Sequence, residues 1–178
     1  KINEYGLTIE RLTGDALNVK IWDSFYEFYL STIDKKWGGA YLTKDFFYSI
    51  NQSMKKKILL VIAKKNDDII AGALNFVGKN TLYGRNWGSK IDIPFLHFEL
   101  CYYQAIEYAI ENKIQIVEAG AQGHHKIQRG YIATSTYSAH YIQNDSFDKA
   151  VRGFVEMEAN EINKQIEIIN QQGSPYSN

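Results

Sequence analysis

The sequence contains little cysteine and little proline, the residues that mark disulfide-rich and proline-rich proteins. It has one cysteine, Cys101, and only two prolines among its 178 residues. A single cysteine excludes an internal disulfide framework and fits a reducing compartment, so we expect a cytoplasmic protein. No apolar run is long enough to cross a bilayer as a helix, so we expect no membrane span.

An excess of charge of either sign is also absent. Twenty basic and twenty acidic residues give a formal net charge of zero. Without a cationic field the chain is not expected to bind duplex nucleic acid. No Pro/Ser-rich linker and no internal repeat divides the sequence, so we expect a single domain over residues 1–178.

Aromatic residues are abundant, at 14% of the chain, and thirteen of them are tyrosines. Most are expected to pack in a tyrosine-rich core, because tyrosine is amphipathic and fits half-buried positions. The alternative is a cleft whose rings stack on a sugar or a peptide.

Hydrophobic periodicity predicts alternating helices and strands. The predicted helices are residues 22–33, 44–55, 95–112 and a C-terminal helix capped by Asp145; the predicted strands are residues 58–63, 69–77, 81–87, 114–118 and 134–142. Hairpins followed by a β-α-β unit predict an α/β fold, a mixed sheet with helices on its faces. Gly84, inside a strand, predicts a bulge or a close approach. One stripe of the 95–112 helix should face the core: Leu96, Leu100, Tyr103, Ile106 and Ile110.

Functional groups gather in residues 84–104 and 118–131. His97 and Cys101 lie one helical turn apart, a spacing that suits a metal-ligand pair or a nucleophile with its base. No CxxC or HExxH spacing accompanies them. We therefore expect a buried thiol and hydrogen-bonded histidines, and we predict no metal.

Glu99 and Glu118 are the acid/base candidates. Glu99 lies near the start of a predicted helix, where the macrodipole favours a carboxylate. Glu118 ends a strand that leads into a glycine-rich turn, where ligand-facing side chains of α/β sheets lie. For each, a structural role is the alternative.

The glycine-rich turn itself is a candidate anion site. Gly120, Gln122 and Gly123 are expected to present successive backbone N–H groups. Lys126 and Arg129 follow one helical turn apart and add positive charge. Neither a P-loop nor a dinucleotide-binding fingerprint is present.

Four strings, at residues 84–88, 96–104, 118–126 and 129–131, together resemble one family. They are similar to the predicted N-acyltransferases of the peptidoglycan biosynthesis/recognition family, a Fem-like branch of the GNAT superfamily. The resemblance runs from about Trp22 to Glu158 and implies a GNAT-like acyl-CoA N-acyltransferase fold.

The resemblance implies transfer of an acyl or aminoacyl group to an amine of a small molecule or a peptidoglycan precursor. Glu99 or Glu118 would be the base, with His97 as a partner. Arg85, Trp87 and the 120–123 turn would bind substrate. The donor would be acyl-CoA or aminoacyl-tRNA, with no tightly bound cofactor.

The resemblance also implies that this chain is the C-terminal half of a longer two-domain protein. Without the N-terminal domain, the helices at 22–33 and 46–54 are expected to expose an aromatic patch and to favour a homodimer. The alternative to an enzyme is a non-catalytic module that recognises a cell-wall fragment or a peptide.

Overall fold

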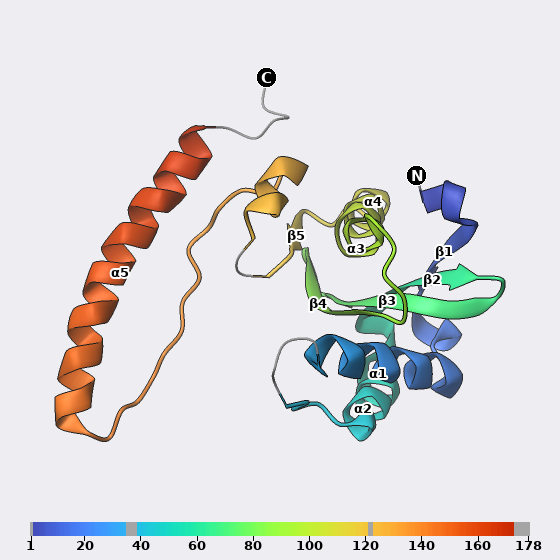
Figure 1. Ribbon diagram of the computed structural model, residues 1–178, viewed down its shortest axis with the longest axis horizontal. Helices are drawn as coiled ribbons and strands as arrows, with labels where there is room; N and C mark the ends of the chain where they lie inside the picture. Colours follow the sequence, from blue (N-terminus) through green and yellow to red (C-terminus); the bar gives the residue numbers. More distant parts are fainter. Residues whose placement is uncertain (1, 35–38, 121–122, 173–178) are drawn as a thin grey trace. The chain divides into compact units, whose positions relative to one another are not determined.

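The computed structural model describes residues 2–34, 39–120 and 123–172 (Figure 1). The chain forms two compact units, residues 1–120 and residues 121–178. Each unit is described by itself below.

The first unit is a five-stranded mixed sheet with helices on both faces (Figure 1). In spatial order its strands are β1 (Leu7–Leu12), β2 (Ile58–Lys65), β3 (Asp68–Val77), β4 (Thr81–Ser89) and β5 (Ile116–Glu118). The first four are antiparallel to their neighbours, and β5 is parallel to β4. The predicted α/β fold is thereby confirmed, while β1 was not predicted.

One face of the sheet packs against α1 (Val19–Asp34) and α2 (Lys44–Met54). Their aromatic side chains form its core: Trp22, Phe25, Phe28 and Phe47 are each at most 2% exposed. The predicted aromatic patch on these helices is therefore wrong, because the sheet itself covers those rings. Thr43 caps α2 as predicted, since its hydroxyl accepts a hydrogen bond from the backbone N–H of Phe46 at 3.4 Å.

The other face packs against a helix built of three consecutive parts, α3 (Leu96–Phe98), the π-helical turn η4 (Glu99–Tyr103) and α4 (Gln104–Glu111). The continuous apolar run in β2 serves both faces: Leu59 and Val61 point to this helix, and Leu60 and Ile62 to α1 and α2.

The π-helical turn changes which side of this helix is buried. Leu96 and Leu100 are buried as predicted, but the next buried residues on α4 are Ala105 and Ala109. A π-helical turn holds one residue more than an α-helical turn, so every later position rotates away from the 3.6-residue stripe. Tyr103 and Ile110, predicted to face inward, are 42% and 73% exposed.

Gly84 in β4 meets both expectations raised by the sequence. The pairing of β3 with β4 shifts register between Leu74 and Asn75, so that Arg85 is an extra, bulged residue. A Cβ on Gly84 would lie 3.2 Å from the backbone oxygen of Glu118 on β5. The close approach at Gly84 and the bulge at Arg85 therefore lie next to each other.

The second unit contains the 3-10 helix η5 (His124–Arg129), an extended segment over residues 131–143, and α5 (Asp145–Gln171). The predicted strand at 134–142 is wrong, because a strand needs a hydrogen-bonded neighbour and this segment pairs with no described strand. Near its start, the backbone of Ala133 exchanges hydrogen bonds of 3.1 and 2.9 Å with the side-chain amide of Asn170.

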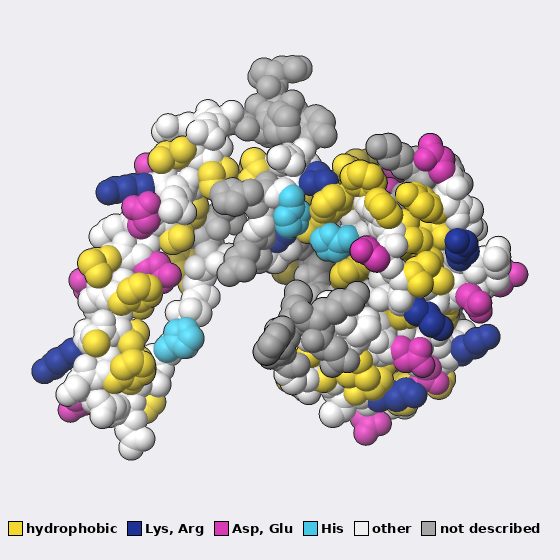
Figure 2. Space-filling model, in the orientation of Figure 1, with side chains coloured by type: hydrophobic (Ala, Val, Ile, Leu, Met, Phe, Trp, Pro, Cys, Tyr) yellow, Lys and Arg dark blue, Asp and Glu magenta, His cyan; other side chains and the backbone are white. Residues whose placement is uncertain are grey.

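The helix α5 starts one residue earlier than predicted, because its N-cap is Asn144 and not Asp145. The side-chain oxygen of Asn144 accepts a hydrogen bond from the backbone N–H of Phe147 at 2.9 Å. None of its residues is buried. Hydrophobic side chains lie along its surface in Figure 2, and Phe147 and Phe154 are 60% and 58% exposed. Among the described residues, no helix combines the length and apolarity that a membrane crossing requires.

Candidate functional site

The first feature of the site is the edge of β4 beyond Tyr83, where its pairing with β5 ends. β3 accompanies β4 along its whole length to Ser89, whereas β5 pairs with it only at Thr81, Leu82 and Tyr83. From Gly84 onward no described strand faces this edge of β4. The backbone groups along such an edge are suited to binding an extended ligand by strand-like hydrogen bonds.

Glu118 lies where the two strands part. It is the last residue of β5, it is exposed, and it stands opposite Tyr83 in the pairing. The bulge at Arg85 begins immediately beyond that pair. Of the two predicted acid/base candidates, Glu118 is therefore the one at the divergence of β4 and β5.

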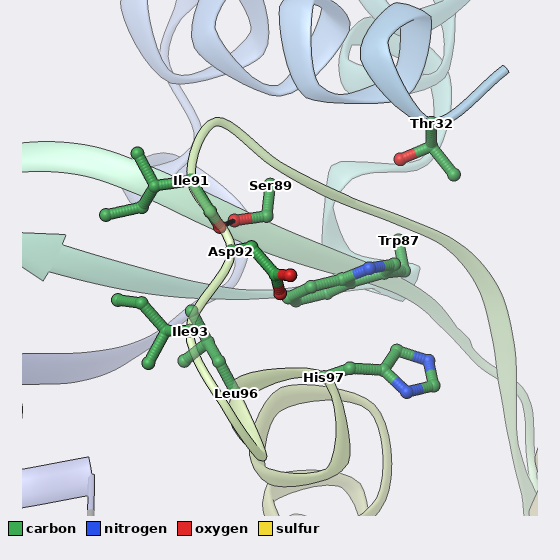
Figure 3. Close-up of a pocket in the computed structure, with 8 residues that line it drawn as sticks. All are labelled: Thr32, Trp87, Ser89, Ile91, Asp92, Ile93, Leu96 and His97. Atoms are coloured by element: carbon green, nitrogen blue, oxygen red, sulfur yellow. Dashed lines mark hydrogen bonds between the residues drawn. The ribbon is translucent and has the colours of Figure 1, made fainter. Parts of the chain in front are cut away.

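A cavity of about 370 Å³ lies farther along β4, where the end of that strand, the following loop, the start of α3 and the end of α1 meet (Figure 3). The residues that line it are Thr32, Trp87, Ser89, Ile91, Asp92, Ile93, Leu96 and His97. Two of them, Trp87 and His97, were predicted from the sequence. Their rings meet edge to face, with centroids 5.3 Å apart and planes at 68°.

Three polar lining residues, Thr32, Ser89 and Asp92, were not found from the sequence. Ser89 and Asp92 belong to a stretch that reads only as the loop before Pro94. Thr32 lies on α1, far away in the chain, and no local pattern connects it with β4. In the structure Ser31, its neighbour, makes that connection: its hydroxyl lies 3.2 Å from the backbone oxygen of Ser89.

Apart from Trp87 and His97, no predicted site residue is among the described residues that line the cavity, and Glu99 and Arg85 have partners elsewhere. Glu99 is half-buried in η4, where its carboxylate accepts a hydrogen bond from Gln104 at 2.9 Å. Arg85 is exposed and donates to the Tyr41 hydroxyl at 2.8 Å, with its guanidinium 6.0 Å from the centre of the Tyr41 ring. The structure thus brings Trp87 and His97 together and leaves Arg85 and Glu99 apart from them.

Cys101 is a free thiol on a partly buried residue that packs against the core beneath α3 and α4. Burial raises its pKa above the ordinary value for cysteine, because the apolar surroundings disfavour the charged thiolate. A thiol in this state is a poor nucleophile and a poor metal ligand. The described residues contain no group of three histidine, cysteine or acidic side chains placed to hold a metal ion.

The predicted anion-binding turn falls partly outside the described residues, since Gln122 is among those not described. Gly120 and Gly123 have φ angles of +76° and +106°, in the region that favours glycine. Lys126 and Arg129 lie on η5; burial lowers the pKa of Lys126, and Arg129 donates to the backbone oxygen of His125 at 2.5 Å. The anion site itself stays a prediction.

The chain is similar in fold to several solved structures of acetyltransferases. The aminoglycoside acetyltransferase meta-AAC0020 from an uncultured soil metagenomic sample, in complex with sisomicin, is 11% identical with a TM-score of 0.57, over 82% of this chain and 100% of its own. A predicted acetyltransferase from Clostridium acetobutylicum, with acetyl-CoA, is 14% identical with a TM-score of 0.56, over 76% and 96%.

A third structure, the ribosomal-protein-alanine N-acetyltransferase of Brucella melitensis biovar Abortus 2308, is 12% identical with a TM-score of 0.50, over 78% of this chain and 99% of its own. At these identities the likeness establishes the fold, which is GNAT-like. A comparison with curated proteins gave no match.

The family assignment comes from the sequence as a whole. The model of the FemAB-like family, described as peptidoglycan biosynthesis/recognition, matches residues 1–178. This agrees with the four strings that resemble Fem-like N-acyltransferases and with the GNAT-like fold. The chain belongs to the FemAB-like family.

Proposed function

We propose that this protein transfers an acyl group from an acyl-CoA to an amine of a small molecule, with a peptidoglycan precursor as the expected acceptor. The observation that carries the proposal is the end of the β4–β5 pairing at Tyr83 and Glu118, beside the bulge at Arg85. The donor is supported by the similar structure from Clostridium acetobutylicum, which contains acetyl-CoA. The similar structures give no support to aminoacyl-tRNA, the alternative donor.

The open edge of β4 suits the donor because the arm of coenzyme A that carries the thioester is extended and contains amide groups. Such a chain binds to a free strand edge as an added strand does. Its thioester would then lie near the bulge, where backbone N–H groups no longer engaged in the β-ladder are available to the developing oxyanion.

The reaction requires the acceptor nitrogen to be neutral. In the proposed step the amine attacks the thioester carbonyl, a C–N bond forms, the C–S bond breaks, and the thiolate of coenzyme A leaves and is protonated. The base takes the proton that the amine loses. Glu118, where the pairing of β4 with β5 ends, is our first choice for this base; Glu99, two residues after His97, is the second.

The experiment is an acyl-transfer assay that measures free thiol released from acetyl-CoA in the presence and absence of an amine. We expect amine-dependent release, and we expect Glu118→Gln to lower kcat more than tenfold with folding intact. Glu99→Gln should have the smaller effect. Glu27→Gln, a change at an exposed position of α1, is the matched control and should leave kcat unchanged.

The opposite results are equally clear. No amine-dependent thiol release with acetyl-CoA or longer acyl-CoA donors would contradict the proposal and favour the non-catalytic binding module. Full activity of both Glu118→Gln and Glu99→Gln would contradict the assignment of the base. The additional N-terminal domain and the homodimer remain predictions, as does peptidoglycan as the source of the acceptor.

A further inference from the structure

Arg85 is the extra residue of the bulge in β4, just beyond the point where the pairing of β4 with β5 ends. Bulges often lie beside functional sites, because they turn a side chain out of the regular alternation of a strand. The guanidinium of Arg85 donates to the Tyr41 hydroxyl at 2.8 Å and lies 6.0 Å from the centre of the Tyr41 ring. The bulged arginine therefore extends toward the segment that precedes α2.

Tyr41 is itself held in place by the core. Its ring meets the ring of Tyr29 edge to face, with centroids 6.4 Å apart. Tyr29 is 2% exposed, and its hydroxyl accepts a hydrogen bond from the backbone N–H of Leu42 at 3.1 Å. One buried ring thus supports both Tyr41 and the backbone beside it. Arg85 is exposed to a ligand but already rests on this support, so binding costs it less conformational entropy than it costs a free arginine.

The positive charge of Arg85 has no acidic partner among the described residues, because none of their ion pairs includes it. The bond to Tyr41 uses one of the five guanidinium N–H donors, and the hydroxyl that accepts it is neutral. The other donors have no partner in the described part of the chain. Parallel N–H donors of an arginine match the two oxygens of a carboxylate.

Glu118 points to the same face of the sheet. Residues opposite each other in neighbouring strands turn their side chains to one face. Glu118 is opposite Tyr83, and Tyr83 is opposite Phe76, which packs in the core with α1 and α2. Tyr41, which holds the guanidinium, contacts Tyr29 of α1 on that face. The candidate base and the arginine therefore belong to one surface, on the α1 and α2 side of the sheet.

We propose that Arg85 binds a carboxylate of the acceptor, so that the acceptor is an amino acid or a peptide whose own amine receives the acyl group. This inference rests on the proposed function, which places acyl-CoA along the edge of β4 with its thioester near the bulge. The acceptor then approaches from the face, where Arg85 holds its carboxylate and Glu118 takes the proton from its amine. Backbone groups of the edge serve the donor and side chains of the face serve the acceptor, so the two ligands do not compete.

A phosphate of the donor is the other anion to weigh for Arg85. In an acyl-CoA the phosphates and the thioester lie at opposite ends of an extended arm. With the thioester near the bulge, the phosphates lie away from Arg85, which is itself the bulged residue. The anion beside Arg85 therefore comes from the acceptor.

The test is a cycle of ligand and protein changes, measured by calorimetric titration of the full chain. L-lysine and L-lysinamide differ in one carboxylate, and glycylglycine and glycylglycinamide form a second pair of this kind. We expect the wild type to bind each acid roughly tenfold more tightly than its amide, and Arg85→Gln to bind the two equally. Tyr41→Phe should keep a smaller preference, because the hydroxyl that orients the guanidinium is lost. Arg152→Gln, which removes a positive charge from α5, is the matched control and should keep the full preference.

A purely structural role of Arg85 would give a different pattern, because loss of its contact with Tyr41 would weaken acid and amide alike. Equal binding of acid and amide by the wild type, no binding of either acid, or a preference that survives in Arg85→Gln would overturn the inference. So would a rise in KM for acetyl-CoA and not for the acid in Arg85→Gln, since the arginine would then serve the donor.

The proposed function fails separately, through the absence of amine-dependent thiol release. A carboxylate preference that depends on Arg85 would still support this arginine as a carboxylate site in that case. Thiol release with equal KM values for acid and amide would have the opposite meaning: the proposed function would stand and the inference would fail.

Discussion

Replacing Gly88 with alanine is expected to separate β4 from α1. A Cβ at position 88 would lie 2.2 Å from the backbone oxygen of Phe28 and 2.3 Å from its carbonyl carbon. Ordinary contacts of a Cβ begin near 3.4 Å, so the two elements would have to move apart by about 1 Å. The obstacle is helix backbone and not the end of a flexible side chain, so rotation of a side chain cannot relieve it.

The cost of this movement follows from what it disturbs. Phe28 is 2% exposed in the core, and the Ser31 hydroxyl beside it lies 3.2 Å from the backbone oxygen of Ser89. Overpacking of a core costs about 1–3 kcal/mol, and more where backbone must move. We expect Gly88→Ala to lower the free energy of unfolding by about 3 kcal/mol, which corresponds to a fall in Tm of roughly 6–12 °C for a chain of this size.

The assay is thermal unfolding followed by circular dichroism. Gly39→Ala is the control, because a Cβ at that position meets nothing within 4 Å. A Tm for Gly88→Ala within about 2 °C of the wild type, with Gly39→Ala also unchanged, would refute the close approach of β4 to α1.

Two further predictions concern side chains outside the cavity. Because burial raises the pKa of Cys101, its reaction with a disulfide reagent at pH 8 should be at least tenfold slower in the folded protein than in urea; equal rates would contradict its burial. Hydrogen bonds from Lys44 and Tyr48 lower the pKa of Asp23, so its stabilising effect is present in full at neutral pH, begins to decline below about pH 4 and is lost as pH falls through the lowered pKa of the folded protein. Urea unfolding should therefore show Asp23→Asn less stable than the wild type at pH 7, with a difference that narrows as pH falls below about 4, whereas Asp67→Asn, at the exposed turn between β2 and β3, should show no such change; a difference that does not narrow in acid would argue against the ion pair.

The sequence was a good guide wherever one local signal decides the structure. The apolar run at β2 predicted a strand buried on both faces, and Thr43 predicted the start of α2. Gly84 predicted a bulge and a close approach, because only a residue without a Cβ fits there. The strings that carry the family resemblance also predicted the fold, because the family that they resemble has a known, GNAT-like fold.

Periodicity failed where the neighbouring element decides the geometry. The stripe through Tyr103 and Ile110 assumed an uninterrupted α-helix, and the π-helical turn at Glu99–Tyr103 rotated that stripe out of the core. The alternation over residues 134–142 indicated a strand, but pairing requires a partner and not only a suitable pattern.

For the candidate site, too, the sequence indicated some residues and only the tertiary structure decided how they are arranged. The family resemblance directed attention to Trp87, and the positions of His97 and Glu118 in the predicted helix and strand directed attention to them. Only the tertiary structure decided that Trp87 and His97 line one cavity and that Glu118 lies at the divergence of β4 and β5. Thr32 and Asp92 could not be found beforehand, because a hydroxyl on a helix and an acid in a loop line one cavity only when packing brings them to the same wall.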